Sequence, residues 1–204
     1  MNSASSKPLR FYWIRHAPPI NPGNICYGAD MDVDLSDTQA LKRQAARLPD
    51  GAEWIASPIQ RAVSTATALS AAHRDGAEIS LSIMDDLREQ SFGQWVGLPR
   101  DALKTEAGFD AYRKDPVNAA PPGGESLMDL ARRVGACSDR IAAAHPQGGD
   151  VVVVAHKGTI RAALHHAAGI DLKDTLRLSI DPLSITIVEY ANARWTLRRM
   201  NMTP

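Results

Sequence analysis

Short apolar runs alternate with longer amphipathic stretches along this chain, and the alternation predicts strands separated by helices. Buried strands are predicted at residues 9–14, 53–56, 79–83 and 151–155, the last being the uninterrupted run VVVVA. Helices are predicted at residues 36–48, 58–72, 123–145 and 159–168, with Ser36 and Ser57 as the N-caps of the first two. Strands that alternate with helices indicate a mostly parallel sheet covered on both faces, so the predicted fold class is α/β, a three-layer α/β/α sandwich.

Two segments depart from this regular alternation. Residues 85–122 are rich in glycine, proline and aromatic residues, and we expect them to form an insertion over the carboxyl edge of the strands, with a short helix at 101–106. The segments 185–190 and 195–199 are expected to form a terminal hairpin. The predicted organisation is one domain over residues 8–204, with a cap-like insertion at about 85–122 and a disordered N-terminus at 1–7.

Composition and charge limit the kinds of molecule that this chain is expected to bind and the location that it is expected to have. The formal net charge of +0 gives no electrostatic case for binding nucleic acid or an anionic membrane. No apolar segment approaches membrane-spanning length, so a cytoplasmic location is the default expectation. The two cysteines, Cys26 and Cys137, lack metal-ligand spacing and are expected to be free thiols. The edge of the hairpin at 185–190 is a candidate surface for a homodimer.

Candidate chemistry lies where two of the predicted strands end. The segments IRHA and VAHKG place His16 and His156 directly after apolar strands. The carboxyl ends of parallel strands face the ligand crevice of an α/β sheet, so both histidines are expected in one pocket. Arg15 precedes the first histidine, and the strand-to-helix junction SPIQRA places Arg61 on the first turn of its helix. Two arginines and two histidines make a compact cationic site, which predicts a phosphate or another small oxyanion as ligand.

Histidine suits covalent chemistry on such a ligand. An unprotonated imidazole is a good nucleophile at neutral pH, and cationic neighbours favour the neutral ring. The arginines and His156 would stabilise the charge of phosphoryl transfer without a metal. A leaving alkoxide needs a proton donor. Glu89, in DLREQSFGQW, is the first candidate, and Asp85 and Asp86 are the alternatives.

Five motifs in order, IRHA, SPIQRAVSTA, LREQSFGQW, GGES and VVAHKGTIR, resemble those of the histidine phosphatase superfamily, the phosphoglycerate mutase-like proteins. The segment 23–36 is similar to the small bacterial branch that includes the α-ribazole phosphatases. The resemblance implies that His16 becomes phosphorylated, that Arg15, Arg61 and His156 clamp the phosphate, and that Glu89 donates the proton. It also implies a three-layer α/β fold and no metal or other cofactor.

The loop after His16 departs from the family pattern. Ala17 stands where the family usually has glycine, and we expect it to be tolerated because the prolines beside it already fix an extended path. The asparagine that helps to hold phosphate in the mutases aligns on Pro22, which leaves Asn21 and Asn24 as its candidate replacements. Further candidate contacts to substrate are Asn21, Tyr27, Trp95 and Lys157, with Tyr112 also considered for the pocket lining and core packing an equal alternative for Trp95.

The leading hypothesis is a metal-independent phosphatase that hydrolyses a small phosphate monoester through a phosphohistidine intermediate. One alternative is a phosphoglycerate mutase, which usually needs a longer insertion or tail to close the site against water. The other is a non-catalytic module that binds a phosphate ligand. The orientation of Glu89 discriminates between catalysis and binding alone. The identity of the natural substrate stays open, because variable loops at 23–33 and 90–122 would determine it.

Overall fold

The computed structural model describes residues 7–26, 28, 31–73 and 79–204. Its centre is a six-stranded sheet with the strand order β3-β2-β4-β1-β5-β6. The strands are β1 (Leu9–Arg15), β2 (Glu53–Ala56), β3 (Leu81–Ile83), β4 (Gly149–Ala155), β5 (Ile185–Ala191) and β6 (Arg194–Met202). The first four strands run parallel, β5 runs antiparallel to β1, and β6 runs antiparallel to β5, which confirms the mostly parallel sheet.

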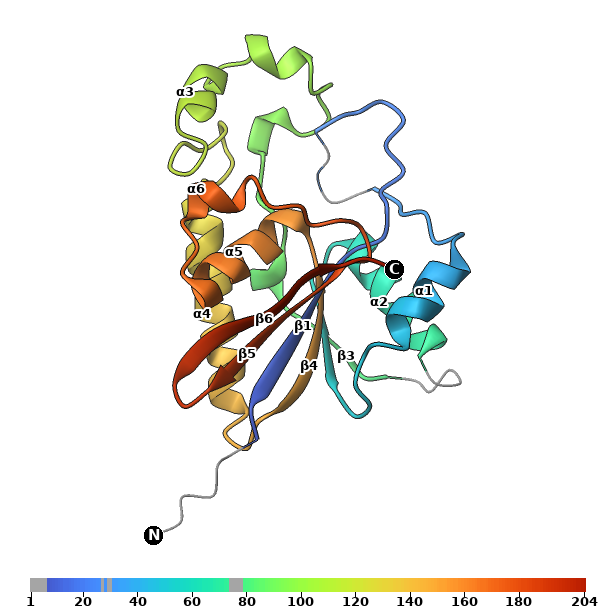
Figure 1. The fold of residues 1–204 in the computed structure, drawn as a ribbon. Helices are drawn as coiled ribbons and strands as arrows, with labels where there is room; N and C mark the ends of the chain where they lie inside the picture. Colours follow the sequence, from blue (N-terminus) through green and yellow to red (C-terminus); the bar gives the residue numbers. More distant parts are fainter. Residues whose placement is uncertain (1–6, 27, 29–30, 74–78) are drawn as a thin grey trace.

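Helices cover both faces of the sheet (Figure 1). The helices α1 (Thr38–Ala45) and α2 (Gln60–Ala72) lie on one face, and α4 (Leu127–Ala144) and α5 (Lys157–Ala168) lie on the other. A short helix, α6 (Leu172–Thr175), follows α5. The predicted three-layer sandwich is therefore confirmed.

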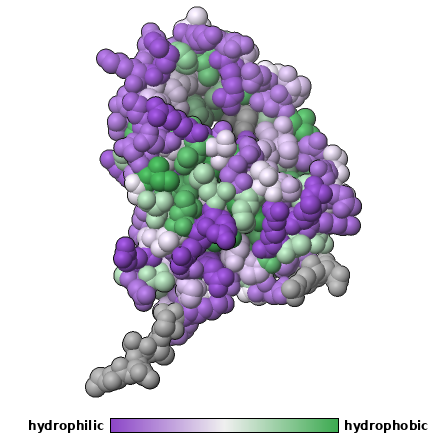
Figure 2. All heavy atoms as spheres, in the orientation of Figure 1, coloured by the Kyte–Doolittle hydropathy of each residue, from purple (hydrophilic) through white to green (hydrophobic). Residues whose placement is uncertain are grey.

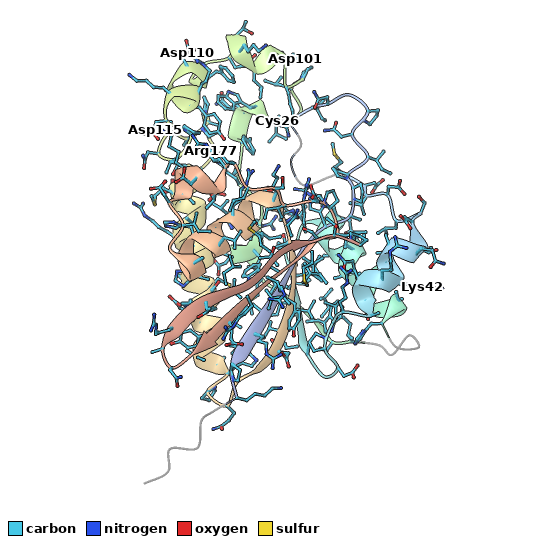
Figure 3. All side chains as sticks on the ribbon, viewed as in Figure 1. Cys26, Lys42, Asp101, Asp110, Asp115 and Arg177 are labelled. Carbon is cyan, nitrogen blue, oxygen red and sulfur yellow. The ribbon has the colours of Figure 1, made fainter. Side chains whose placement is uncertain are left out.

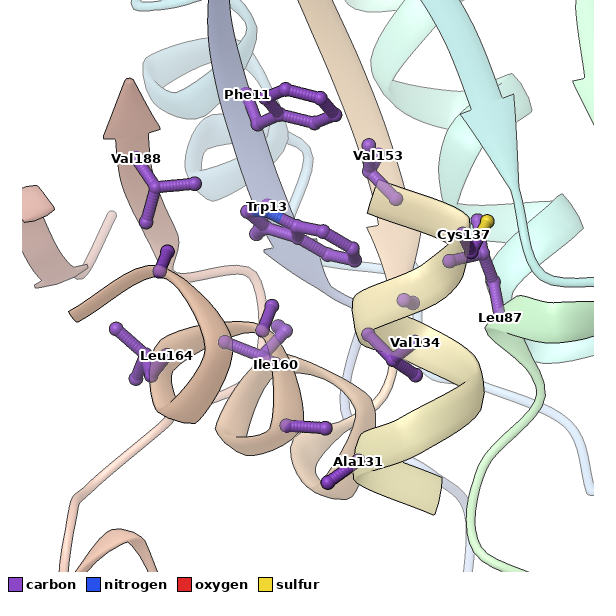
Figure 4. Close-up of a cluster of buried hydrophobic side chains, with 14 of the residues drawn as sticks. Phe11, Trp13, Leu87, Ala131, Val134, Cys137, Val153, Ile160, Leu164 and Val188 are labelled. Atoms are coloured by element: carbon purple, nitrogen blue, oxygen red, sulfur yellow. The ribbon is translucent and has the colours of Figure 1, made fainter. Parts of the chain in front are cut away.

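The apolar strands are continuous because both of their faces are buried. Phe11 and Trp13 of β1 belong to the cluster that packs under α4 and α5, which Figure 4 shows in close-up. Tyr12 and Ile14, the alternate residues, belong to the cluster on the side of α1 and α2. Period-two alternation thus divides one strand between two cores.

Most of the irregular segment lies above the carboxyl ends of the parallel strands, at the top of Figure 1, while Leu87 at its start is buried in the core under α4. It contains the 3₁₀ turns η2 (Asp85–Leu87), η3 (Gly93–Trp95) and η4 (Ala102–Thr105) and the helix α3 (Phe109–Lys114). The helix expected at 101–106 is thus a four-residue 3₁₀ turn, and α3 is an addition. Figure 2 shows that the outer surface of the insertion is mainly hydrophilic.

The insertion has a small core of its own, which fastens it to the loop after β1. Cys26 packs in this core with Trp95 and Leu103, and its backbone exchanges hydrogen bonds with Gly97 and Leu98 at 2.7 Å each. Figure 3 places Cys26 inside the insertion, with Asp101 on its outer rim. The loop that follows His16 and the insertion therefore form one wall over the sheet.

Several local predictions were wrong. The N-cap of α1 is Asp37, whose carboxylate accepts from the backbone N–H of Ala40, and not Ser36. The N-cap position of α2 is Ile59, without a side-chain cap, while the hydroxyl of Ser57 accepts from the N–H of Ile59 at 3.3 Å and contacts His156. Helix α5 begins at Lys157, so it starts directly after the second site histidine.

The terminal hairpin bears on the expected homodimer. Residues 185–190 lie in β5, between β1 and β6, so both hydrogen-bonding edges of that segment are occupied. The outer edge of the sheet is β6 instead. The dimer edge predicted at 185–190 is therefore wrong, and a homodimer by any other surface stays a prediction. The predicted N-terminal segment 1–7 falls almost wholly outside the described residues. Within the described part of the chain, none of the helices combines the length and apolar character needed to cross a membrane.

Candidate active site

The two site histidines lie side by side because their strands are neighbours. Strands β1 and β4 pair in parallel with Arg15 opposite Ala155, so the residues that follow them leave the sheet together. The backbone N–H of His16 donates to the carbonyl of Ala155 at 2.9 Å. The centroids of the His16 and His156 rings are 5.2 Å apart. The expected convergence of strand ends is what the structure shows.

The ring of His16 is buried, and one of its nitrogens is fixed by the backbone. Its Nδ1 lies 2.7 Å from the carbonyl oxygen of Ala17, and the residue is 1% exposed. A carbonyl only accepts hydrogen bonds, so we assign the proton of the neutral ring to Nδ1. That tautomer leaves the lone pair on Nε2 for a nucleophilic role.

The surroundings of His16 keep this ring neutral. Burial, followed by the positive charge of Arg61, lowers its pKa to about 3, with a smaller effect of Arg15 in the same direction. The hydrogen bond with Ala17 acts in the opposite sense and is outweighed. The pKa of His156 lies well below its usual value for the same main reasons, burial and then Arg61. Both rings are therefore neutral at physiological pH.

A serine that sequence reasoning assigned to a helix cap instead orients the second histidine. The hydroxyl of Ser57 lies 2.8 Å from Nε2 of His156, and both residues are fully buried. Ser57 follows the last residue of β2, the strand next to β4 in the sheet. Its position at a strand end was the signal that could have identified it.

Each site arginine is held by a backbone carbonyl. Nη1 of Arg15 donates to Ile180 at 2.7 Å, and Nη1 of Arg61 donates to Gly28 at 2.6 Å. A carbonyl fixes the orientation of a guanidinium without neutralising its charge. Arg61 is also 1% exposed, so its charge acts in a medium of low effective dielectric.

Glu89 lies at the start of α5, where it contacts the second residue after His156. Its Oε2 accepts from the backbone N–H of Gly158 at 3.2 Å, and its Oε1 accepts from that of Gln90 at 3.0 Å. The two alternative acids face away from this position. Asp85 pairs with Arg88 with its side chain 83% exposed, and Asp86 pairs with Arg140 of α4. Of the three candidate proton donors, only Glu89 contacts the first turn of α5, which follows His156 directly.

An ion pair on α4 holds the segment that carries Glu89. Arg133 donates to both carboxylate oxygens of Glu125, at 2.6 and 3.1 Å. The same guanidinium donates to the backbone carbonyls of Asp86 at 2.7 Å and Glu89 at 3.2 Å, while Glu125 accepts from the N–H of Ser91 at 3.0 Å. The pair therefore fixes the backbone on both sides of the acid.

Two cavities meet at Glu89. A cavity of about 340 Å³ is lined by Arg15, Glu89, Gln90, Phe92, Arg100, Tyr112, Leu127, Lys157, Gly158, Arg161 and Leu176. A second, of about 270 Å³, is lined by Gly28, Ile59, Arg61, Arg88, Glu89, Gln90, Ser91, Phe92 and Val96. The described residues contain no cluster of three or more His, Cys, Asp or Glu side chains that could hold a metal ion. The chemistry of the linings is that of an anion site.

The candidate substrate contacts are only partly brought to these cavities. Lys157 and Tyr112 line the larger one. Trp95 is 2% exposed and packs edge-on against Tyr112 at 5.3 Å between ring centroids, so it supports the lining and does not contribute to it. The side-chain amide of Asn21 exchanges two 3.0 Å hydrogen bonds with the backbone of Ile25, which closes its own loop.

The remaining residues of the predicted site lie outside the two cavities or outside the described part of the chain. Asn24 has a left-handed backbone (φ 44°) and lines neither cavity, and Tyr27 lies outside the described residues. Sequence reasoning missed Arg100 and Arg161. Arg161 lies four residues after Lys157 on α5, so the shared helix face was a signal for it.

Ala17 fits the loop that glycine usually occupies in the family. It is fully buried, its backbone is not left-handed, and its N–H donates to the hydroxyl of Thr65 at 2.9 Å. The same hydroxyl donates to the carbonyl of Arg61 at 2.7 Å. Thr65 thus links the loop after His16 to the helix that carries the arginine.

Comparison with known proteins agrees with this geometry. A bifunctional protein of Mycobacterium tuberculosis is 33% identical over 73% of this chain, which spans only 40% of that relative's length. The glucosyl-3-phosphoglycerate phosphatase of the same organism is 31% identical over 75% of this chain and 72% of its own. The solved structure of the α-ribazole phosphatase from Shigella flexneri has a TM-score of 0.82 at 20% identity, covering 95% of this chain and 96% of that one, which shows a shared fold.

The family model supplies the last piece of evidence. The model of the histidine phosphatase superfamily (branch 1) matches residues 11–203, a range that contains all five motifs and both strand-end histidines. With the motifs, the fold and the paired histidines in agreement, the resemblance stated from the sequence is confirmed, and this chain belongs to the histidine phosphatase superfamily.

Proposed function

We propose that this chain is a metal-independent phosphatase that hydrolyses a small phosphate monoester through a phosphohistidine on His16. The observation that carries the proposal is the state of that ring. Its Nδ1 is held by the carbonyl of Ala17, which leaves the lone pair of Nε2 beside His156 and close to two guanidinium charges. A neutral imidazole is a competent nucleophile, and fixed cations stabilise the equatorial oxygens in phosphoryl transfer.

The reaction proceeds in two balanced steps. Nε2 of His16 attacks phosphorus, an N–P bond forms, and the bond between phosphorus and the leaving oxygen breaks with its electron pair on that oxygen. Glu89 gives its proton to the leaving oxygen. Water then attacks the phosphohistidine, Glu89 takes a proton from the water, and the N–P bond breaks to return its pair to Nε2. Arg15, Arg61 and His156 hold the phosphoryl oxygens through both steps.

Glu89 supports catalysis over simple binding of phosphate. Its carboxylate contacts Gly158, two residues after His156, and its side chain lines both cavities. A module that only binds phosphate gains nothing from a carboxylate beside the anion, since like charges repel. A group that carries a proton for the leaving oxygen explains that position.

The test is hydrolysis of an aryl phosphate with and without EDTA, by wild type and His16→Ala. Wild type should be active in EDTA, and a brief reaction quenched in alkali should contain an acid-labile phosphohistidine. His16→Ala should lose both signals. His166→Gln is the matched control, because His166 lies on α5 with Asp139 as partner and lines neither cavity. Activity abolished by EDTA, or retained in His16→Ala, would refute the proposal.

The same experiment separates hydrolysis from mutase chemistry. A phosphoenzyme that transfers its phosphoryl group to phosphoglycerate faster than to water would indicate a mutase. We expect the opposite order, in which water is the faster acceptor.

A further inference from the structure

One glutamine outside the proposed active site is fully buried, and its hydrogen bonds join helix α1 to two other segments of the chain. Gln44 lies on α1, is 0% exposed and lines neither cavity of the site. Its side-chain amide donates to the carbonyl oxygens of Leu183 and Met202, at 2.7 Å each, and its Oε1 accepts from Nη1 of Arg47 at 2.9 Å. A buried amide is stable only where such partners satisfy it, so the position of Gln44 is tied to those two carbonyls.

One of the two carbonyls belongs to a residue with a strained backbone. Leu183 is left-handed, with φ 60°, and it is 5% exposed. Leucine rarely adopts this conformation, because its Cβ crowds the neighbouring carbonyl oxygen, and it persists only where the surroundings fix it. The amide of Gln44 is a contact of that kind. Without it, the carbonyl of Leu183 would lose this donor inside the protein, and the strained turn would lose a reason to stay as it is.

The strained turn surrounds the first arginine of the proposed phosphate clamp. The N–H of Leu183 donates to the carbonyl oxygen of Arg15 at 3.0 Å, and the N–H of Arg15 donates to that of Ser184 at 3.3 Å. Nη1 of Arg15 donates to Ile180, three residues before Leu183. Its buried Nε has no acceptor among the described residues, as expected of a group that is placed to meet a ligand oxygen. Both the backbone and the guanidinium of Arg15 are therefore positioned by residues 180–184.

The end of the last strand anchors the same turn at a second point. The N–H of Asp181 donates to Oδ1 of Asn201 at 2.7 Å, and the side-chain amide of Asn201 donates to the carboxylate of Asp181 at 2.8 Å. Asn201 has φ 52°, a left-handed conformation that asparagine adopts more readily than most residues. The turn is thus held by β6 at residue 181 and by α1 at residue 183.

We propose that Gln44 is a positioning residue for Arg15 in phosphoryl transfer, and that its amide keeps residues 180–184 in the conformation that orients the guanidinium toward the phosphate. The proposal rests on the proposed function, which assigns Arg15 to the clamp, and deepens it by naming a residue that acts on the clamp from outside the cavities. The other members of the clamp are held elsewhere, Arg61 by the carbonyl of Gly28 and His156 by Ser57. The effect of Gln44 is therefore carried by Arg15.

The experiment is a double-mutant cycle between Gln44 and Arg15. Gln44→Leu replaces the amide with an apolar group of similar size. For an aryl phosphate it should lower kcat/KM by about tenfold and raise the inhibition constant of inorganic phosphate by a similar factor, the value of one hydrogen bond to a charged group. In Arg15→Ala, the same substitution should change both constants by less than about twofold, because the side chain on which it acts is gone.

A control and a second variant keep the cycle decisive. Ile141→Ala, in the last turn of α4, destabilises the other core by leaving a cavity and should leave both constants unchanged, because it lines neither cavity of the site. Asn201→Asp sets a carboxylate against that of Asp181 from a partly exposed position, and it serves if Gln44→Leu does not fold. Its effect should be about threefold, as for one neutral hydrogen bond, and absent in Arg15→Ala. Effects that are equal with and without the Arg15 side chain, or no effect at all, overturn the proposal.

Hydrogen exchange separates the failure of this proposal from the failure of the proposed function, since it needs no substrate. In Gln44→Leu, the amides of Arg15 and Leu183 should exchange about tenfold faster than in wild type, beyond any change at Val151 and Val153 of β4. A wild type that hydrolyses no phosphate ester would refute the phosphatase, while this local acceleration would still support the role of Gln44 in holding Arg15. Hydrolysis by wild type, with exchange at Arg15 and Leu183 changed no more than in β4, would leave the phosphatase standing and overturn the positioning role.

Discussion

A methyl group at position 158 should slow the chemistry while it leaves the fold intact. Gly158 is the second residue of α5 and has an ordinary helical backbone, so alanine meets no conformational penalty there. The obstacle is Glu89. A Cβ at position 158 would lie 3.3 Å from the carboxyl carbon of Glu89 and well inside contact distance of its Oε1, as well as 3.1 Å from a methyl of Leu130. The carboxylate is the movable end of a flexible side chain, so it is the group that yields.

The size of the effect follows from how far Glu89 must retreat. Restoring ordinary van der Waals contact moves the carboxylate by about 1 Å, and a displacement of that size costs about a hundredfold in rate when the group is catalytic. It also breaks the 3.2 Å hydrogen bond from Gly158. Stability should change by no more than about 1 kcal/mol, because the helix preference of alanine over glycine offsets the altered contact.

The assay for Gly158→Ala is a comparison of leaving groups. An alkyl phosphate needs protonation of its leaving oxygen, so kcat/KM for it should fall by about a hundredfold. A p-nitrophenyl phosphate leaves as a stabilised anion and should lose far less. Gly135→Ala in α4 is the matched control, since its Cβ meets Nδ1 of His166 at 2.9 Å, outside both cavities. Equal losses for both leaving groups, or none for either, would show that Glu89 is not the proton donor.

Three further outcomes are expected. The folded pKa of His16 is about 3, below its unfolded value, so its contribution to stability is full above about pH 6.5 and is lost as the pH falls. Urea denaturation should therefore show that wild type loses about 3 kcal/mol more stability than His16→Asn between about pH 7.5 and about pH 4.5. An equal loss in both proteins would contradict the assigned burial of His16. Ser57→Ala removes the partner of His156 and should lower stability by about 1–3 kcal/mol and kcat by about tenfold, with recovery in Ser57→Thr, as measured by denaturation and steady-state kinetics. Arg133→Lys loses the bidentate contact with Glu125 and should lower the free energy of unfolding in urea by about 1–2 kcal/mol. It should also lower the rate of hydrolysis by a larger factor for alkyl than for aryl phosphates. An equal loss of rate for both would show that the ion pair acts on the fold alone.

The layered fold was predictable because its strands are buried on both faces and its helices on one. β1 and β4 contain the apolar runs FYWI and VVVVA, as expected for strands at the centre of a covered parallel sheet. The insertion was harder to predict in detail. Its turns η3 and η4 and the helix α3 are three to six residues long, and their small apolar core depends on Cys26, far away in the sequence. Local periodicity does not carry that information.

The residues of the site likewise separate into those that the local sequence predicts and those that only tertiary contacts define. The histidines and Arg15 were predictable because they occupy strand ends, and topology brings strand ends together. Ser57 occupies the same kind of position, but a serine before proline also resembles a helix cap, and only the tertiary contact with His156 decides between the two roles. Arg161 lies within helix α5 and not at a strand end, so its position gave no signal of that kind. Its place in the cavity depends on the carbonyls of the segment after α5, which the sequence pattern does not define.

Glu89 shows why the chemistry nonetheless follows from few residues. Its carboxylate is placed by two backbone N–H groups, and the backbone on either side of it is held by one ion pair from α4. None of these contacts is made by residues 95–120, so we expect substitutions there to leave the acid in place. The proposed proton donor is therefore held by contacts with α5 and α4, and we expect the remaining cap to determine which substrates enter. Substitutions in the cap core around Trp95 should for this reason change selectivity between substrates more than the rate of phosphoryl transfer.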